Sequence, residues 1–277
     1  MEQELGSQLF ERFGSRISLT TAGTIFADYA RTILDTKRQA FDSVRELEKV
    51  PRGELVIAAN EATCVNVLPL VFSSYKERFP GVQLQVVRSY GSNTVQSVLD
   101  NSVDFGITQL PVKERRLEVV QVHSDEIRLL APVGHKLTER SSVSAEEIAE
   151  FPLLLPKTGR TRARVNEYLA DFEDELHISM ELESSEMIKQ FVIAGMGVGF
   201  MAATHAKSEI RRGSLVAVRL EPLPMIRTLG LVYRKDKPLS GAAIGFIEAI
   251  ADFARSEQTS VTAESKQSLP RRRTKAS

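Results

Sequence analysis

Four short polar segments carry the side chains that are best suited to bind a small molecule. Each follows a predicted strand and leads toward a predicted helix or a chain crossover, over residues 60–63, 91–94, 108–109 and 157–161. In open α/β sheets, ligands bind beyond the carboxyl ends of the strands, where helix N-termini present free amide groups and positive dipole ends. Hydroxyl, amide and basic groups at these points favour a small organic anion. Each segment taken alone also fits an ordinary helix N-cap.

The residue types needed for catalysis are present but are not arranged for it. Cys64 has no histidine nearby in the sequence, and no G-x-S-x-G elbow or paired catalytic carboxylate stands out. The histidines lack metal-ligand spacing and are scattered over His123, His135, His177 and His205. We therefore expect no enzymatic activity, no metal site and no cofactor.

A glycine-rich segment at 195–199, Gly-Met-Gly-Val-Gly, superficially resembles a nucleotide-binding loop. It lies between a predicted helix and the following strand, which is the reverse of the context that a dinucleotide-binding fingerprint needs. We interpret it as a helix C-cap that leads into a buried strand.

The elements that would position these segments alternate along the chain after residue 53. Strands are predicted over 54–59, 83–88, 103–108, 117–122 and 126–131, with helices over 65–79 and 94–101. A second cycle has strands over 153–155, 178–182, 197–201, 215–219 and 229–233, with helices over 162–172, 186–194, 203–211 and 242–255. The repeated strand–helix–strand order predicts an α/β fold with parallel strands, right-handed crossovers and helices on both faces of the sheet.

One long helix is predicted before this body, over residues 22–50. It contains no proline and no glycine after Gly23, and it ends at the segment Pro51-Arg52-Gly53. A helix of about 28 residues extends about 42 Å, which is too long to pack within a small domain. It either lies on its own chain or dimerises through apolar residues near the heptad spacing, namely Phe26, Tyr29, Ile33, Ala40, Val44 and Leu47.

The first 20 residues have the pattern of a small β-hairpin. Apolar residues at 9–10 and 17–19 flank a turn that carries Arg12, Gly14 and Arg16. The two arginines are suited to contact DNA phosphates, although an exposed turn often carries such residues simply for solvation. The residue order is more specific than the charge, and it resembles the wing and linker-helix start of LysR-type transcriptional regulators at Leu5, Gly6, Leu9, Phe10, Glu11, Arg12, Arg16, Leu19, Thr20, Ala22 and Gly23.

The resemblance implies a division of the chain into four parts. These are the remnant of a winged helix-turn-helix domain (1–21), a linker and dimerisation helix (22–52), an effector-binding domain (53–258) and a tail (259–277). The effector-binding domain would have two Rossmann-like subdomains of the type 2 periplasmic-binding-protein fold, at 53–125 with 228–258 and at 126–227. The tail is polar and poor in apolar residues, so we expect it to be disordered.

The same resemblance implies the partners. A small-molecule effector would bind in the cleft between the subdomains, the chain would form a homodimer or homotetramer, and Arg12 and Arg16 would contact the backbone of promoter DNA. Ala62 replaces a hydroxyl residue that some members of the family have there, and Thr63 would substitute for it. Lys157 and Arg160 would attract an acidic effector, although solvation at the surface accounts for them equally well. Together, the polar segments and the resemblance give the candidate effector-binding residues Ala62, Thr63, Ser92, Asn93, Thr108, Lys157, Thr158, Arg160, Thr161 and Phe200.

Residues 1–6 correspond only to the last turn of the family's recognition helix. We therefore expect a start codon assigned too late or a truncated gene. Lys plus Arg and Asp plus Glu both number 36, a balance that fits a chain that is mostly effector-binding domain. The single cysteine and the absence of a signal peptide or an apolar span favour a cytoplasmic protein with no membrane partner. A free solute-binding protein of the same fold is the alternative.

Overall fold

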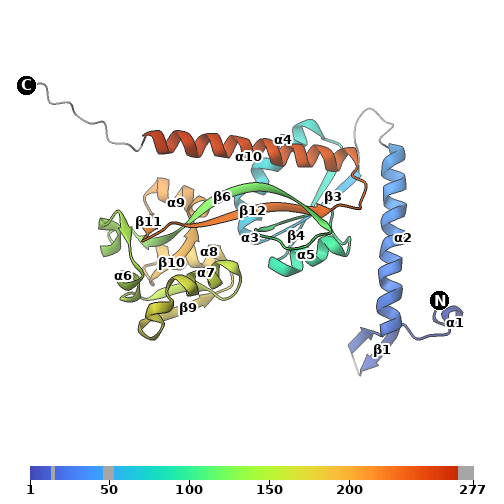
Figure 1. Cartoon of the computed structure of the whole chain (residues 1–277), viewed down its shortest axis with the longest axis horizontal. Coiled ribbons are helices and arrows are strands. Elements are labelled where there is room, and N and C mark those ends of the chain that lie inside the picture. Colours follow the sequence, from blue (N-terminus) through green and yellow to red (C-terminus); the bar gives the residue numbers. More distant parts are fainter. Residues whose placement is uncertain (14–15, 46–52, 268–277) are drawn as a thin grey trace, which may run out of the picture.

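The computed structural model of the chain describes residues 1–13, 16–45 and 53–267. A small N-terminal hairpin joins a long helix, and an α/β body follows (Figure 1). The predicted hairpin is confirmed, because Phe10 pairs with Leu19 and Arg12 with Ile17 in an antiparallel ladder. The N-terminal elements are α1 (Glu2–Leu5), β1 (Phe10–Phe13), β2 (Arg16–Leu19) and α2 (Thr21–Arg45).

Thr20 and Gly23 join the hairpin to the long helix. The Thr20 hydroxyl accepts the N–H of Gly23 at 2.9 Å, as an N-cap does, and donates to the carbonyl of Gln8 at 2.7 Å. A Cβ atom at position 23 would lie only 1.9 Å from the carbonyl oxygen of Leu9. The Leu-Thr-x-x-Gly order therefore lets α2 begin directly against the buried Leu9.

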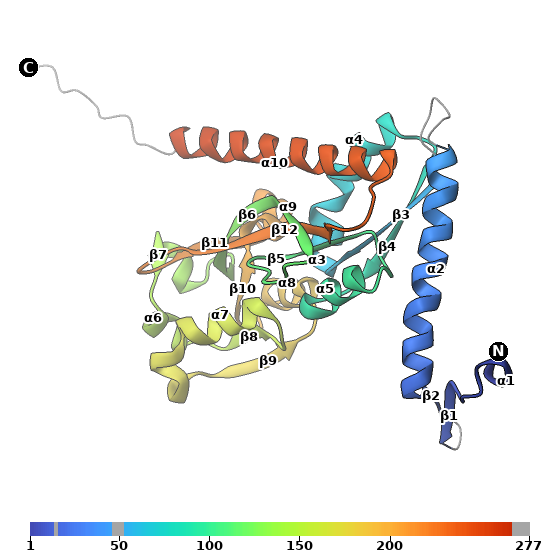
Figure 2. The same cartoon turned by 45° about the vertical axis from the view of Figure 1, so that its right-hand side comes forward.

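The body contains one curled, mixed sheet with helices on both faces (Figures 1 and 2). Its main path has the strand order β4-β3-β5-β12-β6-β10-β8-β9, and β11 joins β6 to β7. The strands are β3 (Gly53–Ala59), β4 (Val82–Arg88), β5 (Phe105–Gln109), β6 (Leu117–Pro132), β7 (Ser142–Val143), β8 (Leu153–Pro156), β9 (Ile178–Leu182), β10 (Val198–Ala202), β11 (Leu215–Leu220) and β12 (Met225–Arg234). Strands β3, β4 and β5 are parallel, as are β8, β9 and β10, so the predicted α/β class is confirmed.

Helices follow most of the strands, as the sequence predicted. The α-helices are α3 (Glu61–Asn66), α4 (Leu68–Arg78), α5 (Gly91–Leu99), α6 (Ala145–Ala149), α7 (Arg160–Tyr168), α8 (Ser185–Ile193), α9 (Lys207–Arg212) and α10 (Gly241–Gln267). Short 3-10 helices are η1 (Lys136–Glu139), η2 (Ala170–Glu175) and η3 (Ala203–Ala206).

Strands β6 and β12 connect the two halves of the body. They pair with each other from Leu117 to Ile127, and each supplies side chains to both halves. Val122 and Leu229 lie in the core of the first subdomain, whereas Leu129 and Met225 lie in the core of the second. The prediction of two separate strands at 117–122 and 126–131 was wrong, because β12 continues the ladder and a register shift between Leu229 and Gly230 absorbs the irregularity.

The core of the first subdomain depends on residues far apart in the sequence. Tyr75 packs edge-on against Phe246 of α10, and its hydroxyl donates to the carbonyl of Ala242 at 2.9 Å. A Cβ atom at Gly245 would lie 2.3 Å from the ring of Phe79, so glycine lets α10 approach α4 closely. The last helix therefore completes the subdomain that β3 begins.

Several predicted boundaries were wrong, and two of these differences have a clear physical cause. One helix was expected over 65–79, but the chain breaks at Val67 between α3 and α4. Pro69 lies in the first turn of α4, where its missing N–H and its ring prevent continuation of the preceding helix. The disordered tail was expected from 259, but α10 continues through Gln267, since no glycine or proline occurs before Pro270. Residues 268–277 lie outside the described residues.

Candidate functional site

The two subdomains contact each other at two places beside the β6–β12 connection. At the first, Arg160 at the start of α7 donates to the carbonyl of Gln109 at the end of β5, at 2.5 Å. At the second, α3 of the first subdomain packs against α8 and η3 of the second. Gln109, Arg160 and the start of α3 belong to segments that the sequence had singled out, whereas α8 and η3 do not. The junction between the subdomains is therefore the candidate functional site.

Two arginines of α7 donate hydrogen bonds to carbonyl groups at the junction, and Arg160 is the one that reaches the first subdomain. Arg160 bonds Gln109, and Arg164 donates to the carbonyl of Ile226 on β12. Both acceptors are neutral carbonyl groups, and neither arginine forms an ion pair with another described residue. A guanidinium group has five N–H donors. Both side chains therefore retain positive charge and donors that an anion can use.

The predicted effector-binding residues of the first subdomain lie in different environments around the contact between Arg160 and Gln109. Thr108 is buried on β5 next to Gln109, so the structure brings it close to the Arg160 contact. Ser92 and Asn93 are exposed in the first turn of α5. Thr63 is fully buried in α3, and its hydroxyl has no hydrogen-bond partner among the described residues.

The predicted effector-binding residues of the second subdomain also lie in different environments. Thr158 is exposed before the α7 N-terminus and Thr161 is half-buried in its first turn, on the same short segment as Arg160. Lys157 turns to Glu183, with 3.0 Å between the ammonium nitrogen and a carboxylate oxygen. Phe200 is fully buried in the core beside Tyr168, so it belongs to the packing of the second subdomain.

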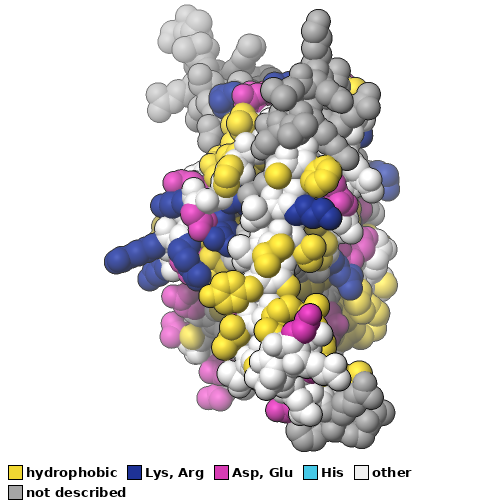
Figure 3. Space-filling model, turned by 90° about the vertical axis from the view of Figure 1, so that its right-hand side faces the viewer, with side chains coloured by type: hydrophobic (Ala, Val, Ile, Leu, Met, Phe, Trp, Pro, Cys, Tyr) yellow, Lys and Arg dark blue, Asp and Glu magenta, His cyan; other side chains and the backbone are white. Residues whose placement is uncertain are grey.

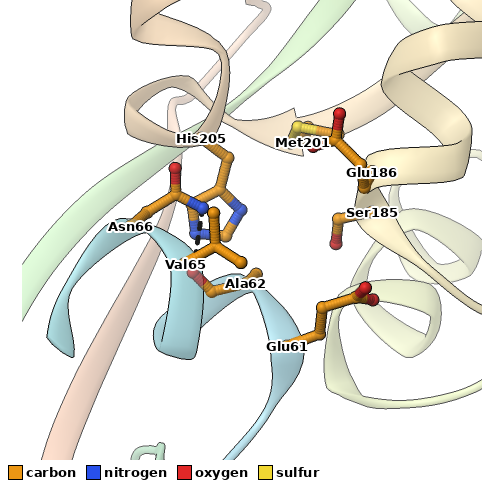
Figure 4. A pocket seen from close by; sticks show the side chains of 8 residues that line it. All are labelled: Glu61, Ala62, Val65, Asn66, Ser185, Glu186, Met201 and His205. Carbon is orange, nitrogen blue, oxygen red and sulfur yellow. Dashed lines mark hydrogen bonds between the residues drawn. The ribbon is translucent and has the colours of Figure 1, made fainter. Parts of the chain in front are cut away.

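A pocket lies on the other side of the junction, between α3 and α8 (Figure 4). Its cavity volume is about 20 Å³, which is room for one or two water molecules. Its side chains come from both subdomains and mix carboxylates, a hydroxyl, an amide, an imidazole and apolar groups. They belong to Glu61, Ala62, Val65, Asn66, Ser185, Glu186, Met201 and His205.

Of these residues, the sequence had placed Glu61 and Ala62 in a candidate ligand-binding segment, and it had named Ala62 as an effector-binding residue. Both Phe200 and Met201 were expected close to the cleft, and Phe200 was chosen as the site residue. Met201 lines the pocket instead, because side chains alternate along a strand and these neighbours face opposite sides of β10. The Ser-Ser-Glu segment at 184–186 was the available signal for α8: Ser184 caps the helix, while Ser185 and Glu186 line the pocket. No local pattern marked His205.

A buried polar cluster lies behind His205. Nε2 of His205 is 2.6 Å from a guanidinium nitrogen of Arg227, which is 3.7 Å from a carboxylate oxygen of Asp125. The hydroxyl of Thr204 donates to the same carboxylate. Arg227 and Asp125 are register partners on β12 and β6. The cluster therefore links the pocket to the strands that connect the subdomains.

The protonation states in this cluster follow from burial and charge. Burial, reinforced by the charge of Arg227, lowers the pKa of His205 to about 3. Burial acts to raise the pKa of the Asp125 carboxyl, but hydrogen bonds from His123 and Thr204 and the charge of Arg227 outweigh it and lower that pKa. At neutral pH, His205 is therefore uncharged and Asp125 is ionised.

Helix α2 carries the residues that the sequence predicted to mediate dimerisation. Figure 3 faces this side of the molecule and shows apolar side chains spread along it. Of the predicted dimerisation residues, Tyr29 is 69% and Ile33 is 67% exposed, Ala40 is exposed and Phe26 is half-buried. The side chain of Val44 and the whole of Leu47 lie outside the described residues. Further large apolar side chains are exposed on the helix at Ile25, Leu34 and Phe41.

The two arginines that were predicted to contact DNA phosphates lie on the hairpin. Arg12 and Arg16 occupy β1 and β2, next to the turn, and their side chains lie outside the described residues. Within the described part of the chain, no three His, Cys, Asp or Glu residues are grouped to hold a metal ion. No helix in that part is long and apolar enough to cross a membrane. The glycine-rich segment joins α8 to β10, and Gly195, with φ 76°, follows the last helical turn as expected.

Comparison with known proteins gives a consistent result. A family model described as the LysR substrate binding domain matches residues 48–255. The RuBisCO operon transcriptional regulator of Allochromatium vinosum is 29% identical over 256 residues, which cover 92% of this chain and 84% of that protein. The HTH-type transcriptional regulator YwqM of Bacillus subtilis is 30% identical over 257 residues, covering 90% and 85%. The structure of full-length CbnR complexed with its target DNA has a TM-score of 0.66 at 19% identity, covering 91% of this chain and 86% of that one.

Proposed function

The chain belongs to the LysR family of transcriptional regulators, and we propose that it senses a small organic anion at the junction of its two subdomains. Its relatives are transcriptional regulators and not enzymes. The α/β body has the type 2 periplasmic-binding-protein fold of the family's effector-binding domain. A proposed function must therefore say how a bound effector changes the arrangement of a protein that regulates transcription.

The observation that carries the anion proposal is the contact between Arg160 and the carbonyl of Gln109. It holds a guanidinium group without a carboxylate partner at the meeting point of both subdomains. Arg160 is also the first residue of α7, where free amide groups and the positive end of the helix dipole favour negative charge. Thr158 and Thr161 supply hydroxyl groups on the same segment. A carboxylate at this point would gain charge-assisted hydrogen bonds.

Binding at this point would act on the arrangement of the subdomains. An anion that takes donors from Arg160 competes with the Gln109 carbonyl for the same group, or bridges the two subdomains through it. An effector shifts a conformational equilibrium only as far as its affinities for the two arrangements differ. The affected equilibrium is the relative rotation of the subdomains about β6 and β12.

We further propose that α2 mediates self-association and that the hairpin contacts DNA. The exposed apolar side chains of Tyr29 and Ile33 lie on one side of a 25-residue helix, at the spacing of a two-helix seam. The relative CbnR has been solved in complex with its target DNA. In this chain, Arg12 and Arg16 are the hairpin residues suited to phosphate contacts. Replacing both with glutamine should weaken binding equally for all DNA sequences and reduce the salt slope by about one per lost phosphate contact.

A thermal-shift screen of carboxylates, inorganic anions and amino acids at constant ionic strength tests the effector proposal. A ligand at a hundred times its dissociation constant should raise the free energy of unfolding by about 2.7 kcal/mol. The shift should be lost in Arg160→Gln and in Thr161→Leu. It should persist in Arg212→Gln, a matched removal of an exposed arginine at the end of α9. Strong shifts from cations or neutral compounds alone, or a hit that survives Arg160→Gln, would refute the anion proposal.

A further inference from the structure

We infer that the two subdomains rotate about a single step of the strands that connect them, at a β-bulge where Val122 and His123 of β6 oppose Leu229 of β12. The remainder of the connection, a connecting ribbon formed by residues 124–127 of β6 and 225–228 of β12, moves as a rigid part of the second subdomain. The inference rests on the proposed function only in that the subdomains must change their arrangement. It is carried by an interrupted ladder, by contacts that fix the ribbon to one subdomain, and by a glycine beside the bulge.

The ladder between β6 and β12 is interrupted at this step. His123 is the register partner of Leu229, and Gln121 is the register partner of Gly230. Val122 lies between them without a partner on β12. Val122 and His123 are consecutive and both buried, whereas side chains normally alternate between the two faces of a strand. These are the properties of a β-bulge, which leaves one residue unpaired and bends the strand locally. The step therefore has fewer backbone hydrogen bonds to resist a change of angle.

The sheet is also narrowest beside the bulge. Strand β5 pairs with β12 as far as Leu229, and β10 pairs with β6 only from Ile127 onward. Among the described strands, residues 124–126 of β6 and 226–228 of β12 therefore pair only with each other. A two-stranded ladder is marginally stable without further support. Bending is expected at the end of the ribbon that has the fewer contacts with its surroundings.

Contacts with the second subdomain hold both strands of the ribbon. On β12, the carbonyl of Ile226 accepts a hydrogen bond from Arg164 of α7. On β6, the carboxylate of Asp125 accepts a hydrogen bond from the hydroxyl of Thr204 of η3. Asp125 and Arg227 are buried register partners, with 3.7 Å between a carboxylate oxygen and a guanidinium nitrogen. Bending within the ribbon would disturb these buried charges, and an uncompensated buried charge is costly.

Contacts from the first subdomain lie at the bulge end of the ribbon. The N–H of Leu110 donates to the carbonyl of Thr228, the last residue of the ribbon on β12, at 2.8 Å. The ring of Phe253 on α10 packs against the ring of His123, with 6.4 Å between their centroids. Rotation at the bulge preserves the buried charge contacts of the ribbon, so it is the bend that costs least.

Gly230 leaves room for this motion and lies close to the Arg160 contact. A Cβ atom at position 230 would lie 2.6 Å from Cδ2 of Leu110. Leu110 follows Gln109, whose carbonyl accepts from Arg160. A change at the Arg160 contact therefore acts on the segment that packs over Gly230. Because the atom that an added methyl group meets is the end of a flexible side chain, Gly230→Ala is expected to displace Leu110 and still fold.

Double electron–electron resonance between pairs of spin labels tests which parts move together. The full chain with Cys64→Ser carries labels at two of three exposed positions, introduced as Glu77→Cys on α4 of the first subdomain, Ile226→Cys on the ribbon and Glu167→Cys on α7 of the second subdomain. Labelled protein is diluted with unlabelled protein, so that only distances within one chain are measured.

Arg160→Gln removes the contact with Gln109 and should change the arrangement of the subdomains. The distances from position 77 to positions 167 and 226 should both shift or broaden by about 2 Å or more. The distance between positions 226 and 167 should stay unchanged, because the ribbon and α7 move together. Arg162→Gln is the matched control: this neighbouring arginine bonds Pro156 and Glu181 within the second subdomain, so all three distances should keep their wild-type values.

Gly230→Ala tests the place of bending. It should change the same two distances from position 77, and adding Leu110→Ala, which removes the obstructing side chain, should restore them. A changed distance between positions 226 and 167 in Arg160→Gln or Gly230→Ala would show bending inside the ribbon and overturn the inference. Unchanged distances from position 77 in both variants would overturn it as well, because no rotation would then occur at the bulge. These distances are measured without an effector, so the inference and the anion proposal can fail separately.

Discussion

Nε2 of His205 and a guanidinium nitrogen of Arg227 lie 2.6 Å apart in the buried region beside β6 and β12. Because the guanidinium group can only donate, the imidazole must accept, and a protonated imidazole cannot do so. The contact therefore excludes the charged form of His205. Burial and the positive charge of Arg227 both disfavour the protonated imidazole, so they act in the same direction and lower the pKa of His205.

This relationship predicts a pH dependence of stability. In the unfolded chain, His205 titrates near its ordinary pKa of about 6.5, and in the folded protein near 3. Between these values the unfolded state binds more protons, so His205 contributes stability that is fully present above about pH 6.5 and is lost as the pH falls toward the folded pKa. The loss should approach about 1.4 kcal/mol per pH unit.

Urea unfolding at pH 7, 6 and 5 measures this effect, and the His205→Gln variant isolates it. The amide oxygen of glutamine can accept from Arg227 but does not titrate. The variant should lose less stability than the wild type over this range, where the carboxyl groups contribute little. An identical pH dependence in both proteins would contradict the assignment of His205 as a buried neutral group.

The close approach of α10 to α4 predicts a second effect. Gly245→Ala would place a Cβ atom 2.3 Å from the Phe79 ring, so helix and ring must separate. Such overpacking should lower the free energy of unfolding by about 1–3 kcal/mol, despite the better helix propensity of alanine. Chemical denaturation measures the change. The double variant with Phe79→Leu should recover part of the loss, and a purely additive double variant would show that the ring is not responsible.

The contact between Gly23 and Leu9 predicts a local effect. Gly23→Ala would bring a Cβ atom 1.9 Å from the Leu9 carbonyl oxygen, a distance that the backbone cannot tolerate. The hairpin should detach from the start of α2, while the body beyond residue 53 keeps its stability. Amide hydrogen exchange should accelerate at the Thr20 N–H, which bonds the Leu9 carbonyl at 3.0 Å. Thr24→Ala, one position along the helix, is the control, and equal protection in the two variants would argue against the steric explanation.

The exposed apolar side chains on α2 predict that substitutions there change the oligomeric state. Tyr29→Asp together with Ile33→Asp would place charges in the proposed seam, where burying them without a partner costs several kcal/mol. Analytical ultracentrifugation should show dissociation to a smaller species, with a folded body by circular dichroism. Arg31→Asp changes the charge on another face of the helix and should leave the mass unchanged. An unchanged mass for the double variant would refute the proposal that α2 mediates self-association.

Local patterns in the sequence were sufficient for most of the elements. The strand at Ile178–Leu182 has the predicted bounds, and the hairpin and long helix occur where turn residues and apolar spacing indicated. The break at Val67 was visible in principle, since Pro69 follows it. Sequence periodicity favoured the longer helix, because apolar residues continue through the break.

The pocket was not accessible to such reasoning. Glu61 and Ser185 face each other only because the subdomains pack through α3 and α8, and no local pattern contains that relationship. His205 resembled an isolated histidine in an alanine-rich segment. Its role depends on Arg227, which comes from a strand beyond α9 and β11. Positions that depend on the relative placement of two subdomains require the three-dimensional structure.

The hydrogen bond from Tyr75 to Ala242 spans 167 residues and has a consequence for biosynthesis. At about 5–20 residues per second, the ribosome adds Ala242 roughly 10–30 s after Tyr75. During that interval the nascent first subdomain lacks β12 and Phe246, so Tyr75 and Phe105 lack the ring that packs against both of them in the folded protein. The second subdomain, by contrast, is contiguous except for β12 and can assemble earlier. The half of the protein that is translated first is thus completed last, and chaperone demand on the nascent chain should fall on residues 53–109.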